Sequence, residues 1–259
     1  MAALATTGAC TPRYAPPPVA DRAELLAVRE VLAAPPVAAE ARGGPVPAAD
    51  GASRIAAVAR RVSDAAQPVC AAHLGRACPL QVELDPSGVP RAQATGSGRI
   101  VVTAGMVRLL EEDDALAAVV AHEAGHHLAG HIGRRFVRGL AAGTAASAVL
   151  GAVLPFGGLL GWALGQGAAE AGAGASRLAF SKEEEREADY LAAYLVARAG
   201  YDPERAGRLW GLLAPHERGR ETGPLDTHPA GADRLAAWRR AVEEIRGSAD
   251  LMPRRFAER

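Results

Sequence analysis

The sequence has no net charge, few aromatic residues and few cysteines. Its 259 residues carry 29 basic and 29 acidic side chains, aromatic residues make up 4% of the chain, and there are three cysteines. A nucleic-acid-binding surface appears as an excess of lysine and arginine, so the balanced charge argues against a nucleic-acid partner. No internal repeat is visible, and the length suits one domain with a sizeable core.

One short pattern indicates a specific chemistry, His-Glu-x-x-His at His122, Glu123 and His126. Asp113 or Asp114 is a good N-cap, and apolar residues follow it with helical periodicity, so the pattern lies inside a predicted helix. Residues four apart share a helix face, so the two imidazoles can bind one metal ion with the glutamate at its open side. The pattern therefore predicts a zinc site with a general base. The alternative is a buried helix that carries two histidines without a metal.

Two further histidines follow the pattern, His127 and His131. If the helix continues, nine residues at about 100° each place His131 on the side opposite His122. His127 points away from the face that His122 and His126 share, toward solvent or a supporting position. Neither is expected to be a metal ligand.

An acidic segment after Ser181 can supply the third ligand. Ser181 is typical of an N-cap with acidic residues in the first turn, and the helix closes at Gly200. On this helix Glu185 and Asp189 share a face, and Ala188 beside them is small enough to let another helix come close. Glu183 and Glu184 are expected on other sides of the helix. A merely solvated helix start is the alternative interpretation of this acidic run.

The downstream pattern Glu-x-x-Ala-Asp, preceded by Phe-Ser-x-x-x-Glu, brings a family into view. The sequence from about Pro90 to Arg234 resembles the zinc metallopeptidases of the CAAX-prenyl-protease and HtpX type, which are gluzincins, especially their periplasmic lipoprotein branch. The resemblance implies that Glu185 is the third zinc ligand and that Asp189 supports the ligand histidines. It also implies that His228, in Thr-His-Pro ahead of Arg234, approaches the metal site.

The same resemblance implies an α+β fold that is mainly helical, a zincin-like domain with a small β-sheet beside the active-site helix. Sequence periodicity predicts helices over residues 21–32 and 52–66, strands over 80–84 and 100–102, and mainly helices from residue 104 onward. Residues 1–47 are interpreted as an N-terminal tether or packing arm, and 48–259 as the metallopeptidase domain. Arg91 stands where the family usually has asparagine in Asn-Ala-x-Ala, which affects contacts at the substrate edge.

Two imidazoles and one carboxylate leave one zinc ion per chain with net positive charge and an open position for water. Glu123 is then expected to take the proton of that water and deliver it to the leaving amine. This predicts peptide hydrolysis without a covalent intermediate, acting on polypeptide substrates. His228 has three interpretations: it donates a hydrogen bond to the oxyanion, it occupies the open position at rest, or it only precedes Pro229 at a helix start.

The positions of the three cysteines are informative, and one of them bears on the location of the protein. Cys70 and Cys78 are spaced for a local disulfide, with two unpaired thiols as the alternative. Cys10 follows small residues and precedes a proline-rich stretch, as at the end of a bacterial lipoprotein signal, although the preceding segment is short and lacks a basic region. Lipidation of Cys10 would require a translated start upstream of Met1.

Residues 139–166 carry no charge and are rich in glycine and alanine. A proline and two glycines split this segment into pieces that are each shorter than a bilayer requires, so a mobile hairpin or lid over residues 139–170 is preferred to a transmembrane span. The expected location is the bacterial periplasm or cell envelope, as an outer-membrane lipoprotein if Cys10 is lipidated. Membrane association would use Cys10 or residues 139–166.

Two classes of function remain open from the sequence. One is a zinc endopeptidase that acts on misfolded or envelope proteins. The other is a catalytically silent, membrane-associated binding or chaperone-like module that retains the fold. Glu123 favours the enzyme, because a silent module has no need of a general base beside its metal ligands.

Overall fold

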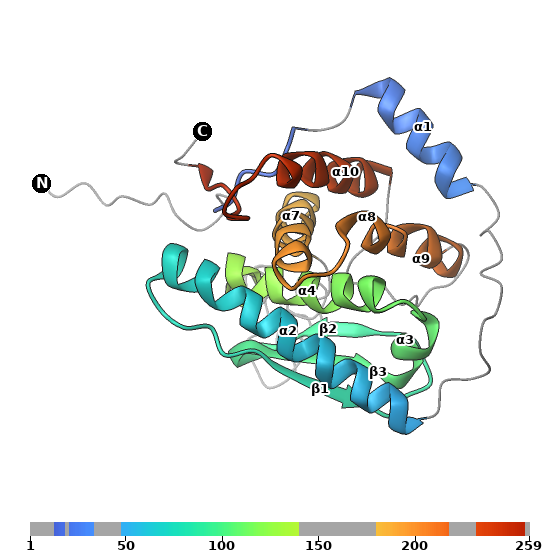
Figure 1. Ribbon diagram of the computed structural model, residues 1–259, viewed down its shortest axis with the longest axis vertical. Coiled ribbons are helices and arrows are strands. Elements are labelled where there is room, and N and C mark those ends of the chain that lie inside the picture. The colour runs from blue at the N-terminus through green and yellow to red at the C-terminus, as the bar shows by residue number, and fades with distance from the viewer. Residues whose placement is uncertain (1–12, 19–20, 34–47, 140–179, 218–231, 257–259) are drawn as a thin grey trace, which may run out of the picture.

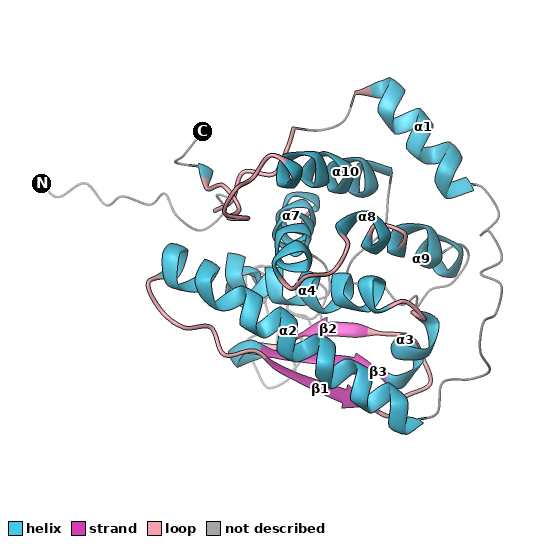
Figure 2. Ribbon diagram, in the orientation of Figure 1, coloured by secondary structure: helices cyan, strands magenta, loops and turns pink. Residues whose placement is uncertain are grey.

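The computed structural model describes residues 13–18, 21–33, 48–139, 180–217 and 232–256 (Figure 1). Eight α-helices and three strands have both ends within these residues. The strands are β1 (Gln81–Asp85), β2 (Ala92–Ala94) and β3 (Arg99–Thr103). The helices are α1 (Arg22–Ala33), α2 (Ala48–Leu74), α3 (Ala104–Leu109), α4 (Asp113–Ala129), α7 (Lys182–Arg198), α8 (Pro203–Ala206), α9 (Leu209–Glu217) and α10 (Ala232–Arg246). The predicted α+β fold that is mainly helical is confirmed at this level (Figure 2).

The three strands form one sheet in the order β1-β3-β2, with β1 parallel and β2 antiparallel to β3. Strand β2 is therefore an edge strand, and it packs against α4. The turn before β3 depends on Gly98, which has φ +81°, and a Cβ there would lie 2.2 Å from the carbonyl oxygen of Pro79. This close approach brings the start of β3 against the residues that lead into β1.

Helix α4 is the central element of the fold. It contacts β2 and β3 on one side and α2, α7 and α8 on others, and α7 crosses it on the side away from the sheet (Figure 1). Leu116, Val120 and Ala124 are each 0% exposed, and the helix itself carries buried apolar residues on all of its faces. A helix that is apolar all round is stable only when it is buried, so the composition of α4 explains its place.

The end of α4 decides the position of the residues that follow. Gly130 is the C-cap residue with φ +77°, in the left-handed region, and its N–H donates to the carbonyl oxygens of His126 and His127. Glycine adopts this conformation without steric cost and commonly ends helices in this way. The chain therefore changes direction at Gly130.

Several predicted elements differ from those observed. Helix α2 is longer than the predicted 52–66 and continues through Pro68, and the N-cap of α4 is Glu112, just before the two predicted aspartates. Strand β2 was not predicted, because three residues of sequence Ala-Gln-Ala have no strand propensity and pairing with β3 alone makes them a strand. The proposed boundary at residue 47 stays a prediction, and α1, which precedes it, packs on α9 and α10.

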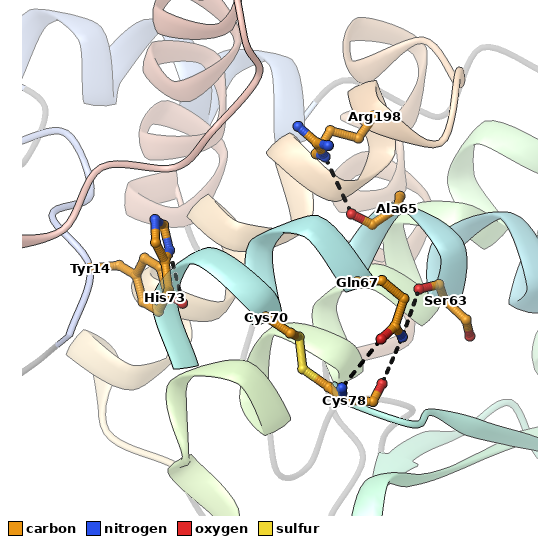
Figure 3. The surroundings of a disulfide bond; sticks show 8 residues. All are labelled: Tyr14, Ser63, Ala65, Gln67, Cys70, His73, Cys78 and Arg198. Atoms are coloured by element: carbon orange, nitrogen blue, oxygen red, sulfur yellow. Dashed lines mark hydrogen bonds between the residues drawn. A yellow bond between two sulfur atoms is a disulfide. The ribbon is translucent and has the colours of Figure 1, made fainter. Parts of the chain in front are cut away.

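The predicted disulfide is present between Cys70 at the end of α2 and Cys78 ahead of β1, with the Cα atoms 5.9 Å apart (Figure 3). The Gln67 side chain reinforces this connection, since its Nε2 donates to the Cys78 carbonyl at 3.0 Å and its Oε1 accepts from the Cys78 N–H at 3.3 Å. The disulfide therefore ties the end of α2 to the start of the sheet.

No helix among the described residues is both long and apolar enough to cross a membrane. Cys10 lies outside the described residues, and so do residues 140–179, which contain almost all of the uncharged segment.

Candidate metal centre

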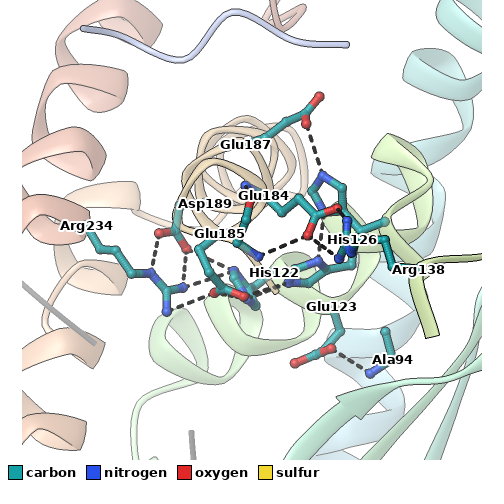
Figure 4. A network of polar contacts seen from close by, with 12 residues as sticks. Ala94, His122, Glu123, His126, Arg138, Glu184, Glu185, Glu187, Asp189 and Arg234 are labelled. Carbon is teal, nitrogen blue, oxygen red and sulfur yellow. Dashed lines mark hydrogen bonds and ion pairs between the residues drawn. The ribbon is translucent and has the colours of Figure 1, made fainter. Parts of the chain in front are cut away.

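Helices α4 and α7 approach each other closely where both carry small residues. A Cβ added to Gly125 would lie 2.7 Å from the carbonyl oxygen of Ala188. Only glycine at this position lets the two backbones come so near. As the sequence indicated for Ala188, the small residue permits the approach of another helix, and the face with His122 and His126 meets the face with Glu185 (Figure 4).

The three side chains His122, His126 and Glu185 form a compact, buried cluster of metal-ligating atoms. The two Nε2 atoms lie 3.1 Å apart, and the Glu185 carboxylate oxygens lie 3.4 Å from Nε2 of His122 and 3.6 Å from Nε2 of His126. Ligands bound tetrahedrally to zinc at their usual distances lie about 3.3 Å from one another. Both the donor set and its spacing therefore fit a zinc ion.

His122 is held by Asp189, whose carboxylate accepts from Nδ1 at 2.9 Å. Burial lowers the pKa of the His122 imidazole, but hydrogen bonds to Asp189 and Glu185 act in the opposite direction and raise it to about 9. Burial also tends to raise the pKa of Asp189, yet the Arg234 guanidinium and His122 outweigh it and keep that pKa below its usual value. The site is thus negative around His122, and a cation at Nε2 is electrostatically favoured.

Arg234, from α10, completes this side of the site. It binds Asp189 through two hydrogen bonds of 2.7 Å, and its Nη1 lies 3.0 Å from Glu185 Oε2. Its guanidinium also covers the Trp210 ring, 4.1 Å from the ring centre. The sequence identified Arg234 only as an anchor of the family resemblance, because nothing in its own helix shows which carboxylates it meets across α7.

His126 has a different support. Its Nδ1 lies 2.7 Å from Nδ1 of His131, and Nε2 of His131 lies 3.0 Å from Oε2 of Glu187. The His126 ring stacks on Phe180, with the ring centres 3.9 Å apart. Burial lowers the pKa of His131, although the hydrogen bond to Glu187 acts in the opposite direction. The lowered pKa keeps this imidazole neutral near pH 7.

The predicted place of His131, opposite His122, is therefore wrong. That prediction assumed a helix that continues, whereas α4 ends at Ala129 and the turn at Gly130 returns His131 to the metal side. His131 is still absent from the ligand cluster of the described residues and contacts a candidate ligand instead. The glycine one residue before His131 was the signal that could have revealed this.

Glu123 lies beside the cluster, between α4 and the sheet. Its Oε2 accepts a hydrogen bond of 2.6 Å from the N–H of Ala94 in the edge strand β2, and the residue is 2% exposed. The backbone of β2 thereby orients the carboxylate. His127 contacts the sheet instead, with Nε2 3.1 Å from the carbonyl oxygen of Arg99.

Of the two neighbouring glutamates on α7, Glu183 is exposed, but Glu184 is buried although it does not join the metal cluster. Glu184 forms a capping box with Ser181 and binds Arg138 through two contacts of 2.8 Å. It therefore stabilises the start of the helix that carries Glu185. His228 lies outside the described residues.

Two imidazoles, one carboxylate and an adjacent glutamate define a site of the zinc metallopeptidase class. The chain belongs to peptidase family M48, whose sequence pattern it matches over residues 53–242. Family membership confirms the predicted enzyme class, a metalloprotease, and the predicted zinc cofactor.

The sequence is also similar to proteins named mitochondrial metalloendopeptidase OMA1. The relative from Schizosaccharomyces pombe is 29% identical over 167 residues, which are 64% of this chain and 45% of the relative. The relative from Saccharomyces cerevisiae is 26% identical over 189 residues, 66% of this chain and 50% of the relative. That from Arabidopsis thaliana is 29% identical over 150 residues, 57% of this chain and 29% of the relative. The chain thus spans half or less of the length of these relatives.

These comparisons confirm one expectation in part and correct another. The resemblance to the zinc metallopeptidases is confirmed at the level of the family, and these three relatives carry the name OMA1 rather than a name of the HtpX or CAAX-prenyl-protease type. The predicted location in a bacterial periplasm or cell envelope, including the outer-membrane lipoprotein, is wrong, because these relatives are named as mitochondrial proteins. The envelope signals in the sequence came from Cys10 and residues 139–166, whose features are compositional.

Proposed function

We propose that this chain is a zinc-dependent endopeptidase with a zincin-like catalytic domain, in which His122, His126 and Glu185 hold the metal. The observation that carries the proposal is the buried cluster of three ligand atoms with Glu123 next to it. The name of the relatives, metalloendopeptidase, supports cleavage within polypeptide chains.

When bound, zinc would act as a Lewis acid that polarises the scissile carbonyl and lowers the pKa of water, so that a hydroxide nucleophile can form near neutral pH. Glu123 is placed to accept the proton of that water and to pass it to the leaving amine. The Ala94 N–H holds the Glu123 carboxylate in orientation. Asp189 keeps the proton of His122 on Nδ1, which leaves Nε2 free to bind the metal.

We propose unfolded or flexible polypeptides as the substrate class. Glu123 lies against the edge strand β2, and among the described residues β2 pairs with β3 alone. An edge strand presents backbone groups that an extended peptide can pair with, whereas a folded protein rarely offers such a segment. Misfolded proteins satisfy this requirement.

The substitution Glu123→Gln tests the proposed function. Glu123 is not a ligand in this assignment, so the variant should retain near-stoichiometric zinc while casein hydrolysis falls by about 10² or more. Glu183→Gln, at an exposed position of α7, is the matched control and should hydrolyse casein normally. Unchanged turnover in Glu123→Gln would exclude this mechanism, and zinc binding without hydrolysis by the unaltered chain would identify the silent binding module.

The role of His228 stays a prediction with two opposite outcomes. If His228 occupies the open zinc position at rest, His228→Ala should raise turnover of an unfolded substrate. If it stabilises the oxyanion, the same change should lower turnover by roughly 10². Turnover that changes in neither direction would leave His228 as a helix-start residue.

A further inference from the structure

The carboxylate of Glu187 joins two parts of the molecule that are far apart in sequence. Its Oε2 lies 3.0 Å from Nε2 of His131, the histidine that contacts His126. Its Oε1 accepts two backbone hydrogen bonds, from the N–H of Arg13 at 2.6 Å and from the N–H of Tyr14 at 2.8 Å. Nη2 of Arg134 also lies 3.5 Å from Oε2. Glu187 is 0% exposed, so this carboxylate depends on these partners for its stability.

Residues 13–15, which we call the terminal strap, are also held by the other end of the chain. The N–H of Ala15 donates to the carbonyl of Arg254 at 3.0 Å, and the N–H of Phe256 donates to the carbonyl of Arg13 at 3.3 Å. Tyr14 is 1% exposed and belongs to the hydrophobic core. The terminal strap is therefore a docked part of the fold.

The order of contacts determines where each proton lies. His126 can bind a metal through Nε2 only if its own proton is on Nδ1. That proton is then donated to Nδ1 of His131, whose proton must lie on Nε2 and is donated to Glu187. The tautomer of His126 is thus set by an acceptor two hydrogen bonds away.

A carboxylate, whose two oxygens both accept, satisfies the donors around Glu187, which are two backbone N–H groups, His131 and, at the longer distance of 3.5 Å, Arg134. One of its oxygens must accept from the two backbone N–H groups of the terminal strap, and the other must accept from His131. A glutamine has one accepting oxygen and one donating nitrogen, so it must fail at one of these ends. If its amide nitrogen faces His131, the tautomer of that histidine is reversed and two protons meet between His131 and His126.

We propose that Glu187 and the terminal strap are positioning elements of the metal centre, and that zinc binding and docking of the strap stabilise each other. The inference rests on the proposed function to the extent that His126 is a zinc ligand. The strap holds Glu187, and Glu187 orients His126 through His131. Because coupling between two binding events is reciprocal, zinc must also strengthen the docking of the strap.

The first test measures zinc affinity in Glu187→Gln by competition with a chromophoric chelator. The substitution keeps the side-chain volume, and affinity should fall by about 10- to 100-fold, as for other groups that orient a metal ligand. The absorption spectrum of the Co²⁺-substituted variant should also change, which mere loss of stability would not cause. Glu184→Gln is the matched control, since Glu184 is the nearby buried glutamate on α7 but has no hydrogen bond to His131, and its Co²⁺ spectrum should be unaltered.

The second test follows hydrogen exchange at the amides of Arg13 and Tyr14 in the full chain, with and without zinc. Zinc should slow exchange at these two amides in the unaltered protein, and Glu187→Gln should abolish that difference. Amides of α2 that lie away from the site provide the internal control.

The outcomes separate the two hypotheses. If the unaltered chain binds no zinc, the proposed function fails. If it binds zinc and Glu187→Gln binds zinc equally tightly with an unaltered Co²⁺ spectrum, the positioning role of Glu187 is overturned while the proposed function stands. If affinity falls but exchange at Arg13 and Tyr14 is the same with and without zinc, the role of the terminal strap is overturned.

Discussion

The two histidines of the metal centre, His122 and His126, have supports that differ in length and origin. His122 donates directly to Asp189, a carboxylate held by Arg234 from α10. His126 reaches a carboxylate only through a second imidazole, His131. The carboxylate beyond it, Glu187, is held mainly by two backbone N–H groups, with Arg134 at the longer distance of 3.5 Å.

The difference shows how one site can place negative charge near the metal and also connect the metal position to a distant part of the fold. A carboxylate one hydrogen bond from His122 places its charge close to the metal position, where it has the larger electrostatic effect. A second imidazole moves the other carboxylate further from the metal, and its charge then counts for less. The longer route instead connects the metal position to residues 13–15 at one end of the described chain. The support of His122 therefore mainly sets charge, and that of His126 mainly sets coupling to the fold.

The largest effect on zinc binding is expected from a change of Glu185, the third ligand beside the two supported histidines. Glu185→Ala should abolish stoichiometric zinc binding, because it removes one of the three ligand atoms. Glu183→Ala should retain zinc and stability. Glu184→Ala should also retain zinc, but its free energy of unfolding should fall by about 1 kcal/mol or more, because the capping box is lost. Zinc content measured across the three variants decides the assignment, and loss of metal in Glu184→Ala alone would move it by one residue.

A smaller effect is expected from Asp189→Asn, which tests the comparison directly. The asparagine oxygen or nitrogen can still meet His122 or Arg234, but the negative charge is lost, and zinc affinity should fall by roughly 10- to 100-fold. The loss should exceed that in Glu187→Gln, since Asp189 is nearer the metal position. Chelator competition on both variants provides the ranking, and a larger loss in Glu187→Gln would break the comparison.

The packing of α4 on α7 should affect both supports together. In Gly125→Ala the new Cβ would meet the Ala188 carbonyl at 2.7 Å, so the helices must separate, at a cost of about 1–3 kcal/mol in the free energy of unfolding. Zinc affinity should fall with it, because α7 carries Glu185, Asp189 and Glu187. Gly133→Ala is the control, since nothing lies within 4 Å of a Cβ there, and it should unfold at or above the normal temperature.

The smallest effect on zinc is expected from the disulfide, which touches neither support. Reduction of the bond between Cys70 and Cys78 should lower the free energy of unfolding by roughly 2–3 kcal/mol, the range for a short closed loop. Zinc affinity should be unchanged. Thermal unfolding and chelator competition under reducing conditions check both statements, and a fall in affinity would mean that the end of α2 is coupled to the metal centre.

The sequence by itself determined the features that depend on residues near one another along the chain. The spacing of His122 and His126 placed both on one helix face, Ser181 marked the start of α7, and the short interval between Cys70 and Cys78 suited a disulfide. These are local relations, set by helix geometry and by the hydrogen bonds of a few neighbouring residues. The same periodicities predicted individual helices and two of the strands, whereas the mainly helical α+β fold class was implied by the family resemblance.

The tertiary structure decided everything that required contacts between distant segments. Strand β2 exists because β3 pairs with it, and Arg234 became part of the site because α10 packs on α7. His131 was misplaced because the turn at Gly130 was not foreseen, and the link from Glu187 to residues 13–15 spans more than 170 positions of sequence. A buried charge must find its partners wherever the fold brings them, and sequence periodicity carries no information about which helices will meet.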